Sequence, residues 1–183
     1  MKVCVLDGHP PEDGRAFETW MHRFVQILQE RGHNVNRILL RDRRIKSCLG
    51  CWACWVKTPG RCVIEDDMEA VFAEIVSADW LIMASPMIMG YPSALLKKCM
   101  DRMVPLVHPY IEIEGGECHH RPRYANAPKV GLLLERSGDT DVEDIDITTD
   151  LISRFARNMK TMHQFTRLTS QPVEEVCNAI DHL

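Results

Sequence analysis

Short apolar runs alternate with amphipathic stretches along this chain. The apolar runs have the length of buried strands and lie at residues 2–6, 35–40, 80–84, 129–135 and 162–168. Between them, apolar residues recur at three- and four-residue intervals, which predicts helices at 15–31, 66–77, 93–104, 142–159 and 172–182. Asp66 and Glu69 are expected to form a capping box at the second helix, and Asp144 to lie on a solvated face of the fourth. Strands that alternate with helices in this way form a parallel sheet covered by helices on both faces.

Five such βα units predict a three-layer doubly wound sandwich, with a five-stranded parallel sheet in the order 2-1-3-4-5. We expect one domain over residues 1–183, with a cysteine-rich loop at 47–66 and an insertion at 108–127. Ligands of such sheets bind beyond the carboxyl ends of the strands, at the switch point between strands one and three. The loops at 8–15, 85–92 and 136–141 therefore form the predicted crevice. Because the cysteine-rich loop follows strand two, we expect it at the same edge of the sheet, in the same pocket.

Composition narrows the class of protein. A hydrophobic fraction of 45% and a charged fraction of 26% are typical of a globular domain. A net charge of −4 gives no general attraction for nucleic acid or for an anionic membrane. The apolar runs fall far short of the roughly 20 residues that span a bilayer, and the N-terminus is polar by Asp7, unlike a signal peptide. We expect a cytoplasmic protein whose eight cysteines are reduced, metal-bound or catalytic.

Four cysteines, spaced C-x2-C-x2-C-x7-C, are the most chemically informative residues: Cys48, Cys51, Cys54 and Cys62. Thiolates this close together bind soft metals, and the C-x2-C-x2-C core is typical of an iron–sulfur cluster. Zinc would also accept four thiolates, but structural zinc sites usually separate two CxxC pairs by a dozen residues or more. The loop could instead bind nothing and serve as a thiol or disulfide redox sensor.

The loop after the first strand, Gly8 to Arg15, leads directly into a helix. Backbone N–H groups at such a helix start can hold a phosphate, with glycines allowing close approach. Pro10 and Pro11 have no N–H to donate, and Glu12 and Asp13 repel an anion. Local sequence thus leaves a phosphate site and a plain polar turn equally open, and the position of the loop in the sheet favours the phosphate.

Taken together, these segments resemble the flavodoxin-like NAD(P)H-dependent FMN reductases and, within them, the iron–sulfur flavoproteins. The resemblance lies in the first loop with Gly14-Arg15-Ala16, in Ser85 to Gly90 with the helix behind it, and in Cys48 to Cys62. It runs from residue 1 to about residue 104, and more loosely through the strand that ends near residue 135. His9, Pro11 and Ala16 depart from the family's phosphate loop, and Ile88 and Met89 replace aromatic residues of its flavin loop.

The resemblance implies two cofactors, FMN and a [4Fe–4S] cluster. FMN would lie on Gly8, His9, Pro10, Gly14, Arg15 and Ala16, with its ring along Pro86, Met87, Ile88, Met89 and Gly90 and its third side closed by Ser137 and Gly138. The four cysteines would ligate the cluster. NAD(P)H or a small redox protein such as ferredoxin would donate electrons. The apolar loops Trp52 to Val56 and Met87 to Tyr91 add the expectation of a homodimer or homotetramer.

Three functions remain open from the sequence. The first is a redox flavoprotein that passes electrons between FMN and the cluster. The second is an NAD(P)H-dependent FMN or quinone reductase without a cluster, and the third is a flavin-free metal-binding or redox-sensing module. Cys118-His119-His120, in the insertion, is interpreted as a polar loop or a subunit contact because neighbours in sequence rarely converge on one ion.

Overall fold

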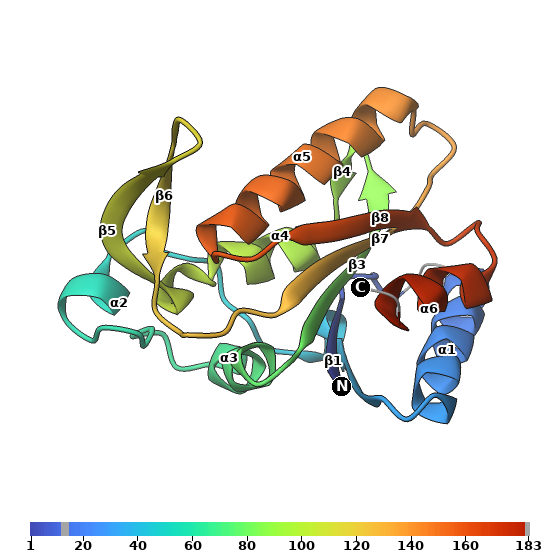
Figure 1. Cartoon of the computed structure of the whole chain (residues 1–183), viewed down its shortest axis with the longest axis horizontal. Coiled ribbons are helices and arrows are strands. Elements are labelled where there is room, and N and C mark those ends of the chain that lie inside the picture. The colour runs from blue at the N-terminus through green and yellow to red at the C-terminus, as the bar shows by residue number, and fades with distance from the viewer. Residues whose placement is uncertain (12–14, 182–183) are drawn as a thin grey trace.

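Five parallel strands form the centre of the molecule in the computed structural model, which describes residues 1–11 and 15–181. The order is β2-β1-β3-β7-β8 (Figure 1). This is the predicted 2-1-3-4-5 order, so the fold prediction is confirmed. The strands are β1 (Lys2–Asp7), β2 (Asn34–Leu39), β3 (Trp80–Ile88), β7 (Lys129–Glu135) and β8 (His163–Leu168).

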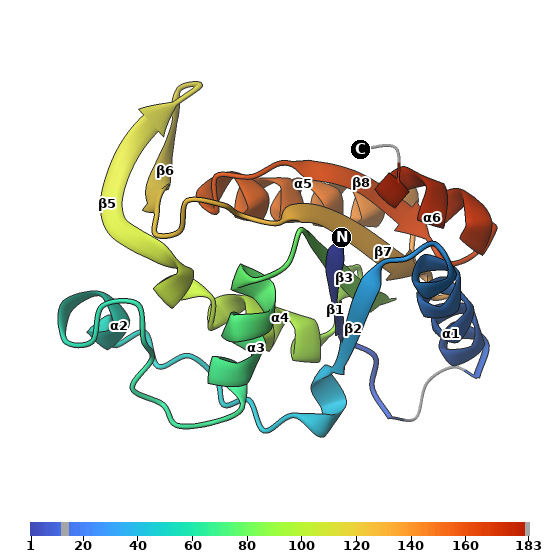
Figure 2. The same cartoon turned by 60° about the horizontal axis from the view of Figure 1, so that its bottom comes forward.

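Helices cover both faces of the sheet (Figure 2). Alternate residues of β1 point to opposite faces, so Val3 and Val5 pack in one apolar cluster and Cys4 and Leu6 in the other. The first cluster lies under α1 (Arg15–Glu30) and α6 (Val173–Asp181). The second lies under α3 (Met68–Val76), α4 (Ala94–Asp101) and α5 (Val142–Asn158).

Two segments differ from the sequence-based expectation. β3 continues past residue 84 to Ile88 and folds back as β4 (Tyr91–Pro92), which pairs with it in antiparallel fashion. The insertion, expected as a polar loop, forms an antiparallel hairpin of β5 (Val107–Glu114) and β6 (Glu117–Pro122). Its turn is Gly115-Gly116, and both glycines have positive φ. Glycine adopts positive φ at little steric cost, so these two residues allow the hairpin to turn there.

Short elements complete the chain: η1 (Leu40–Asp42), α2 (Ala53–Val56) and η2 (Val104–Leu106). The capping box expected from Asp66 and Glu69 is wrong, because α3 begins after Asp67 without a side-chain cap. Asp66 is occupied elsewhere, by Arg102. Asp144, expected on a solvated face, instead exchanges capping hydrogen bonds with Asp141 at the start of α5. No helix in residues 1–11 or 15–181 combines the length and the apolar character needed to cross a membrane.

Candidate functional site

A cavity of about 400 Å³ lies where β3 and β7 end. It is lined by Pro86, Met87, Ile88, Met89, Glu135, Arg136, Ser137 and Asp139. Four predicted flavin-loop residues and Ser137 therefore line one hollow, and its size is in the range of small-molecule sites. Gly138 does not line the cavity. Glu135, Arg136 and Asp139 were not among the predicted binding residues, although Glu135 ends an apolar strand and the other two lie in the loop that follows it, at the carboxyl edge.

Gly8 is held between β3 and the start of α4. Its N–H donates to Ala84 O at 2.8 Å, and its carbonyl accepts from Ser93 Oγ at 2.5 Å. A Cβ at this position would lie 2.8 Å from both Ser93 Oγ and Leu96 Cβ. Because the same Ser93 hydroxyl accepts from Leu96 N and caps α4, only glycine lets the first loop approach this helix so closely.

His9 is turned into the protein. Its side chain is 1% exposed and stacks on Phe17. Its ring nitrogens lie 3.3 Å from Asp7 Oδ1 and 3.2 Å from Glu135 Oε2. The imidazole thus connects the end of β1 to the end of β7, and both ring nitrogens are already in contact with carboxylates.

Asp7 is a buried carboxylate beneath the first loop. It accepts from His9 N at 2.9 Å and from Arg37 Nη2 at 2.5 Å. Burial opposes its ionisation, but the hydrogen bonds from His9 and Arg37 lower the pKa of Asp7 below its ordinary value. Asp7 therefore stays ionised at neutral pH and sits beside the loop as an internal anion.

Residues 8–11 offer no free backbone donor to a phosphate. Gly8 N and His9 N donate within the protein, and Pro10 and Pro11 carry no N–H. Backbone donors for a phosphate on this loop would then come from the start of α1. The predicted residue Gly14 lies outside the described residues, as does the side chain of Arg15. The backbone of Arg15 and Ala16 opens α1, where N–H groups have no partner within the helix.

The loop after β7 is fixed by its own hydrogen bonds. Ser137 Oγ lies 2.5 Å from Asp139 Oδ1 and 2.8 Å from Thr140 Oγ1. Arg136 Nη2 donates to Thr140 O at 2.7 Å. This wall of the cavity is therefore preorganised, a property that reduces the entropy lost when a ligand binds.

The four predicted metal-binding cysteines surround a second, much smaller hollow. They line a cavity of about 70 Å³ together with Leu49, Gly50, Trp52, Val63, Ile64 and Val104. Burial and then the neighbouring cysteines, Cys62 foremost, raise the pKa of the Cys54 thiol. Cys54 thus lies close to the other three cysteines.

The cysteines surround a space and do not converge on a point. In the described part of the chain, no three His, Cys, Asp or Glu side chains lie close enough together to hold a metal ion. A zinc ion requires four ligands about 2.3 Å from one centre. The four thiols therefore line a hollow without forming a preformed site for a single ion.

The cysteine loop and the β3–β7 cavity lie apart, so the prediction that they share a pocket is wrong. The two hollows have no lining residue in common. Ser93, just before α4, binds Gly8, whereas Arg102, just after α4, binds Lys46 at the base of the cysteine loop. This eight-residue helix is about 12 Å long. Figures 1 and 2 show α2 at the far end of the molecule from α1.

Trp55 explains why the loop leaves the carboxyl edge of the sheet. Its indole Nε1 donates to Val104 O and Val107 O, at 3.1 Å and 3.0 Å. Its ring stacks on Trp52 and also contacts His120 of the hairpin. The segment 40–67 is long enough for Trp55 to reach Val104 and Val107. The periodicity of the sequence does not reveal these long-range hydrogen bonds.

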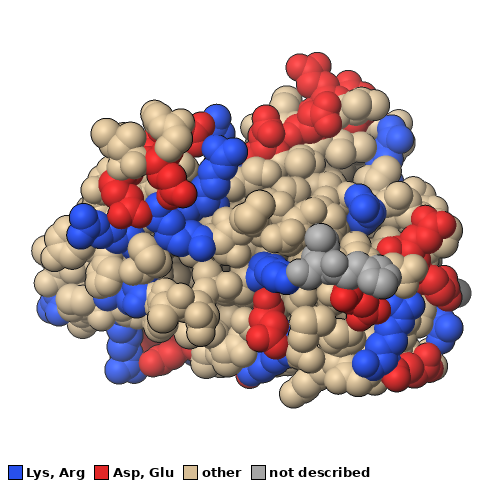
Figure 3. Space-filling view, in the orientation of Figure 1, with Lys and Arg blue, Asp and Glu red and all other residues tan. Residues whose placement is uncertain are grey.

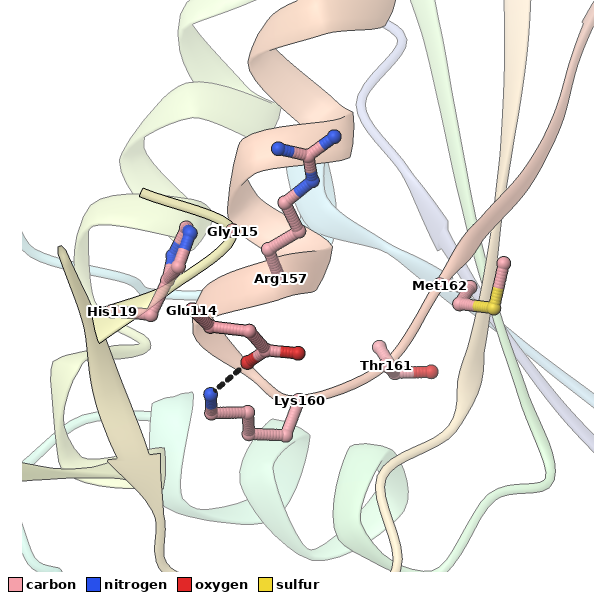
Figure 4. A pocket seen from close by; sticks show the side chains of 7 residues that line it. All are labelled: Glu114, Gly115, His119, Arg157, Lys160, Thr161 and Met162. Atoms are coloured by element: carbon pink, nitrogen blue, oxygen red, sulfur yellow. Dashed lines mark hydrogen bonds and ion pairs between the residues drawn. The ribbon is translucent and has the colours of Figure 1, made fainter. Parts of the chain in front are cut away.

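A larger hollow, of about 540 Å³, lies between the hairpin and the C-terminal end of α5 (Figure 4). Its charged side chains are paired: Lys160 contacts Glu112 and Glu114, and Arg157 contacts Glu117 at 3.0 Å. It lies near the start of β8, at the amino edge of the sheet. These ion pairs join the hairpin to the body of the protein and leave no free charge for a ligand.

Acidic side chains gather along α5 on the face shown in Figure 3. Glu143, Asp146 and Asp150 are exposed there. The hairpin beside them carries charges of both signs. This face therefore gives no positive field that would attract a polyanion.

Known proteins place the chain in a family. Residues 1–133 match the model of the NADPH-dependent FMN reductases. An iron–sulfur flavoprotein of Methanosarcina thermophila is 29% identical over 138 residues, 75% of this chain and 64% of that protein. One from Methanocaldococcus jannaschii is 34% identical over 106 residues, 58% of this chain and 53% of that protein. The chain thus spans between about half and two-thirds of these relatives.

A solved structure shows the same fold. The FMN-dependent NADH-azoreductase of Bacillus anthracis, crystallised in complex with FMN, has a TM-score of 0.64 and 14% sequence identity. The match covers 99% of this chain and 94% of that one. With the family model covering the first strand through β7, the chain belongs to the NADPH-dependent FMN reductase family.

Proposed function

We propose that this protein is an FMN-dependent oxidoreductase of the iron–sulfur flavoprotein type, with NAD(P)H or a small redox protein as electron donor. The observation that supports the flavin is the 400 Å³ cavity formed by Pro86 to Met89 and the loop after β7. Its position, at the carboxyl ends of β3 and β7, is where ligands of this fold bind. Family membership supports the same cofactor.

The residues present fit a flavin ring better than they fit its phosphate. Pro86, Met87, Ile88 and Met89 offer an apolar wall, and Arg136 to Asp139 a rigid polar one. The phosphate would take its donors from the start of α1, beside the anionic Asp7. FMN, when bound, would supply exchange of one or two electrons. The chain's own residues would orient the ring and exclude water from one face.

The four cysteines would hold the cluster, which would exchange single electrons. Supporting observations are the shared hollow, the electrostatic coupling of Cys54 to the other three thiols, and the names of the relatives. Because this hollow is separate from the flavin cavity, the two groups would be distinct redox sites of the chain and not neighbours in one pocket.

Exposed apolar side chains support a homo-oligomer. In the cysteine loop, Leu49 is 73% and Val56 79% exposed, and at the tip between β3 and β4 Met89 is 86% exposed. Apolar surface beside both proposed redox sites is the kind of surface that subunits cover. Sedimentation of the purified protein tests this point directly.

Anaerobic purification followed by a visible spectrum and iron analysis tests the proposal. We expect flavin absorbance, a broad cluster band near about 400 nm and about four irons per chain. Cys51→Ser should lose the iron and keep the flavin. Arg15→Ala is expected to weaken FMN binding. Absence of flavin from protein reconstituted with excess FMN would refute the oxidoreductase assignment.

Two alternatives rest on specific observations. No group of three metal-ligand side chains in the described residues is close enough to hold an ion, which favours a reductase without a cluster. It predicts flavin absorbance and no iron. The lack of free N–H donors in residues 8–11 favours a flavin-free metal-binding or redox-sensing module, which predicts a protein without flavin absorbance.

A further inference from the structure

A buried ion pair lies at the base of the cysteine loop. Arg102 Nη1 lies 2.7 Å from Asp66 Oδ2, and Nη2 lies 3.1 Å from Oδ1, so the pair is bidentate. The Arg102 side chain is 1% exposed and the Asp66 side chain 0%. A charge pair removed from water to this degree is expensive unless further hydrogen bonds satisfy it.

Those further bonds close the loop. Asp66 Oδ2 also accepts from Lys46 N at 2.9 Å, and Arg102 Nη1 donates to Lys46 O at 2.7 Å. Lys46 and Asp66 are the two ends of the segment that carries all four cysteines. The guanidinium of Arg102, which lies just after α4, thus joins the two ends of the loop by hydrogen bonds.

The same guanidinium lies beside the ends of the cysteine loop: it binds the carbonyl of Lys46, two residues before Cys48, and the carboxylate of Asp66, four residues after Cys62. Burial disfavours the charge on Arg102, but Asp66 and then the Cys62 sulfur raise its pKa. Its Nε is buried and has no hydrogen-bond partner among the described residues. A buried N–H donor that lacks such a partner, on a cation at the base of a loop of four cysteines, favours a negatively charged group nearby.

We propose that Arg102 is a positioning residue for the cysteine site: it joins the two ends of the loop and presents a positive charge to Cys62 and to whatever anionic group the four cysteines hold. The second part rests on the proposed cluster, whereas the first part does not. Neither Arg102 nor Asp66 follows from the cysteine spacing, because they lie 36 residues apart in the sequence.

The first experiment tests the loop in the metal-free protein. Trypsin can cleave at Lys57 and Arg61, which are exposed between Cys54 and Cys62. Arg102→Met should increase cleavage of this loop about tenfold, since a change of about 1.4 kcal/mol in a local opening equilibrium has that effect. Lys97→Met is the matched control: it removes an exposed ion pair with Asp101 on the same helix. Equal cleavage rates in the Arg102→Met and Lys97→Met variants would overturn the positioning role.

The second experiment measures the reduction potential of the reconstituted cluster. Removing the cation should lower the equilibrium constant for reduction about tenfold, equivalent to about 59 mV for one electron. Asp66→Asn should raise that constant by a similar factor because the cation is then less neutralised. A residue that only supports the loop would shift both variants in the same direction, which would refute the charge assignment.

Two more variants keep the test decisive. Arg102→Lys retains the charge and should restore most of the potential while leaving loop cleavage fast. The double variant Asp66→Asn with Arg102→Met leaves no buried charge unpaired, and its potential should fall below that of Asp66→Asn alone. If the unaltered protein holds no iron after anaerobic reconstitution, the proposed cluster and the charge assignment fail together, and trypsin cleavage still decides the positioning role.

Discussion

Gly90→Ala should perturb the flavin loop through two effects that the structure separates. Gly90 has φ +76°, a conformation that L side chains adopt with strain. An added Cβ would also meet the Asp144 carboxylate, with Asp144 Cγ at 3.1 Å and Oδ1 closer still. That carboxylate cannot simply move away, because Asp144 and Asp141 form the capping box of α5.

The two effects have different sizes. Placing alanine in the left-handed region costs about 1 kcal/mol. Displacing Asp144 loses a cap worth about 1 kcal/mol more. Gly32 provides the matched control because it has φ +84° but open space around it. We therefore expect Gly32→Ala to lose about 1 kcal/mol of unfolding free energy and Gly90→Ala about 2 kcal/mol.

Urea denaturation of four proteins measures this difference: Gly32→Ala, Gly90→Ala, Asp144→Ala and the double variant of Gly90 with Asp144. In the Asp144→Ala background, Gly90→Ala should cost no more than Gly32→Ala, a coupling of about 1 kcal/mol. FMN titration should show weaker binding for Gly90→Ala only. If Gly90→Ala and Gly32→Ala are equally destabilised, the Asp144 contact does not restrict this loop.

Three further outcomes follow from buried groups. Burial opposes ionisation of Asp66, but hydrogen bonds from Arg102 and the backbone hold its pKa at about 2, against an ordinary 3.8. The lowered pKa stabilises the folded protein above about pH 4, so roughly 2 kcal/mol of unfolding free energy should be lost between pH 4 and pH 2. Acid titration of the Asp66→Asn variant should lack this loss. Arg37→Met should cost about 3 kcal/mol in urea denaturation, because it removes the cationic partner of the fully buried Asp7 and leaves that carboxylate, among the described residues, only its contacts with His9, and a smaller loss in the double variant with Asp7→Asn would support that cause. Burial raises the pKa of Cys4 and Cys99 to about 12, so iodoacetamide at pH 8 should alkylate exposed Cys48, Cys51 and Cys118 in the folded, metal-free protein and spare those two, as mass spectrometry would show.

The sequence predicts the sheet because periodicity and burial are local signals. The runs at 2–6 and 129–135 are almost wholly apolar and become the central strands β1 and β7. Strand order then follows from the alternation with helices. The meeting of Pro86 to Met89 with the loop after β7 was also predictable, since the carboxyl ends of neighbouring parallel strands lie at one edge of the sheet.

Contacts between distant residues were not predictable in this way. The capping box expected at Asp66 failed because Arg102, 36 residues later, binds that carboxylate. His9, a candidate phosphate donor by position, is occupied by Asp7 and by Glu135, 126 residues away. The hydrogen-bond partners of a polar side chain depend on which groups lie near it in the folded structure, and the periodicity of the sequence does not give that information.

The position of the cysteine loop determines how the two proposed redox sites are related to each other. A segment that starts at the carboxyl edge of β2 was expected to stay there, yet Trp55 and Arg102 hold it beside the C-terminal end of α4. The β3–β7 cavity, proposed to hold the flavin, lies toward the other end of the same helix. A rigid helix between two sites fixes their separation, so changes in the cysteine loop should leave the β3–β7 cavity unaltered. Loss of iron without loss of flavin is therefore what this architecture predicts, whereas simultaneous loss of both would mean that the two sites are coupled through α4.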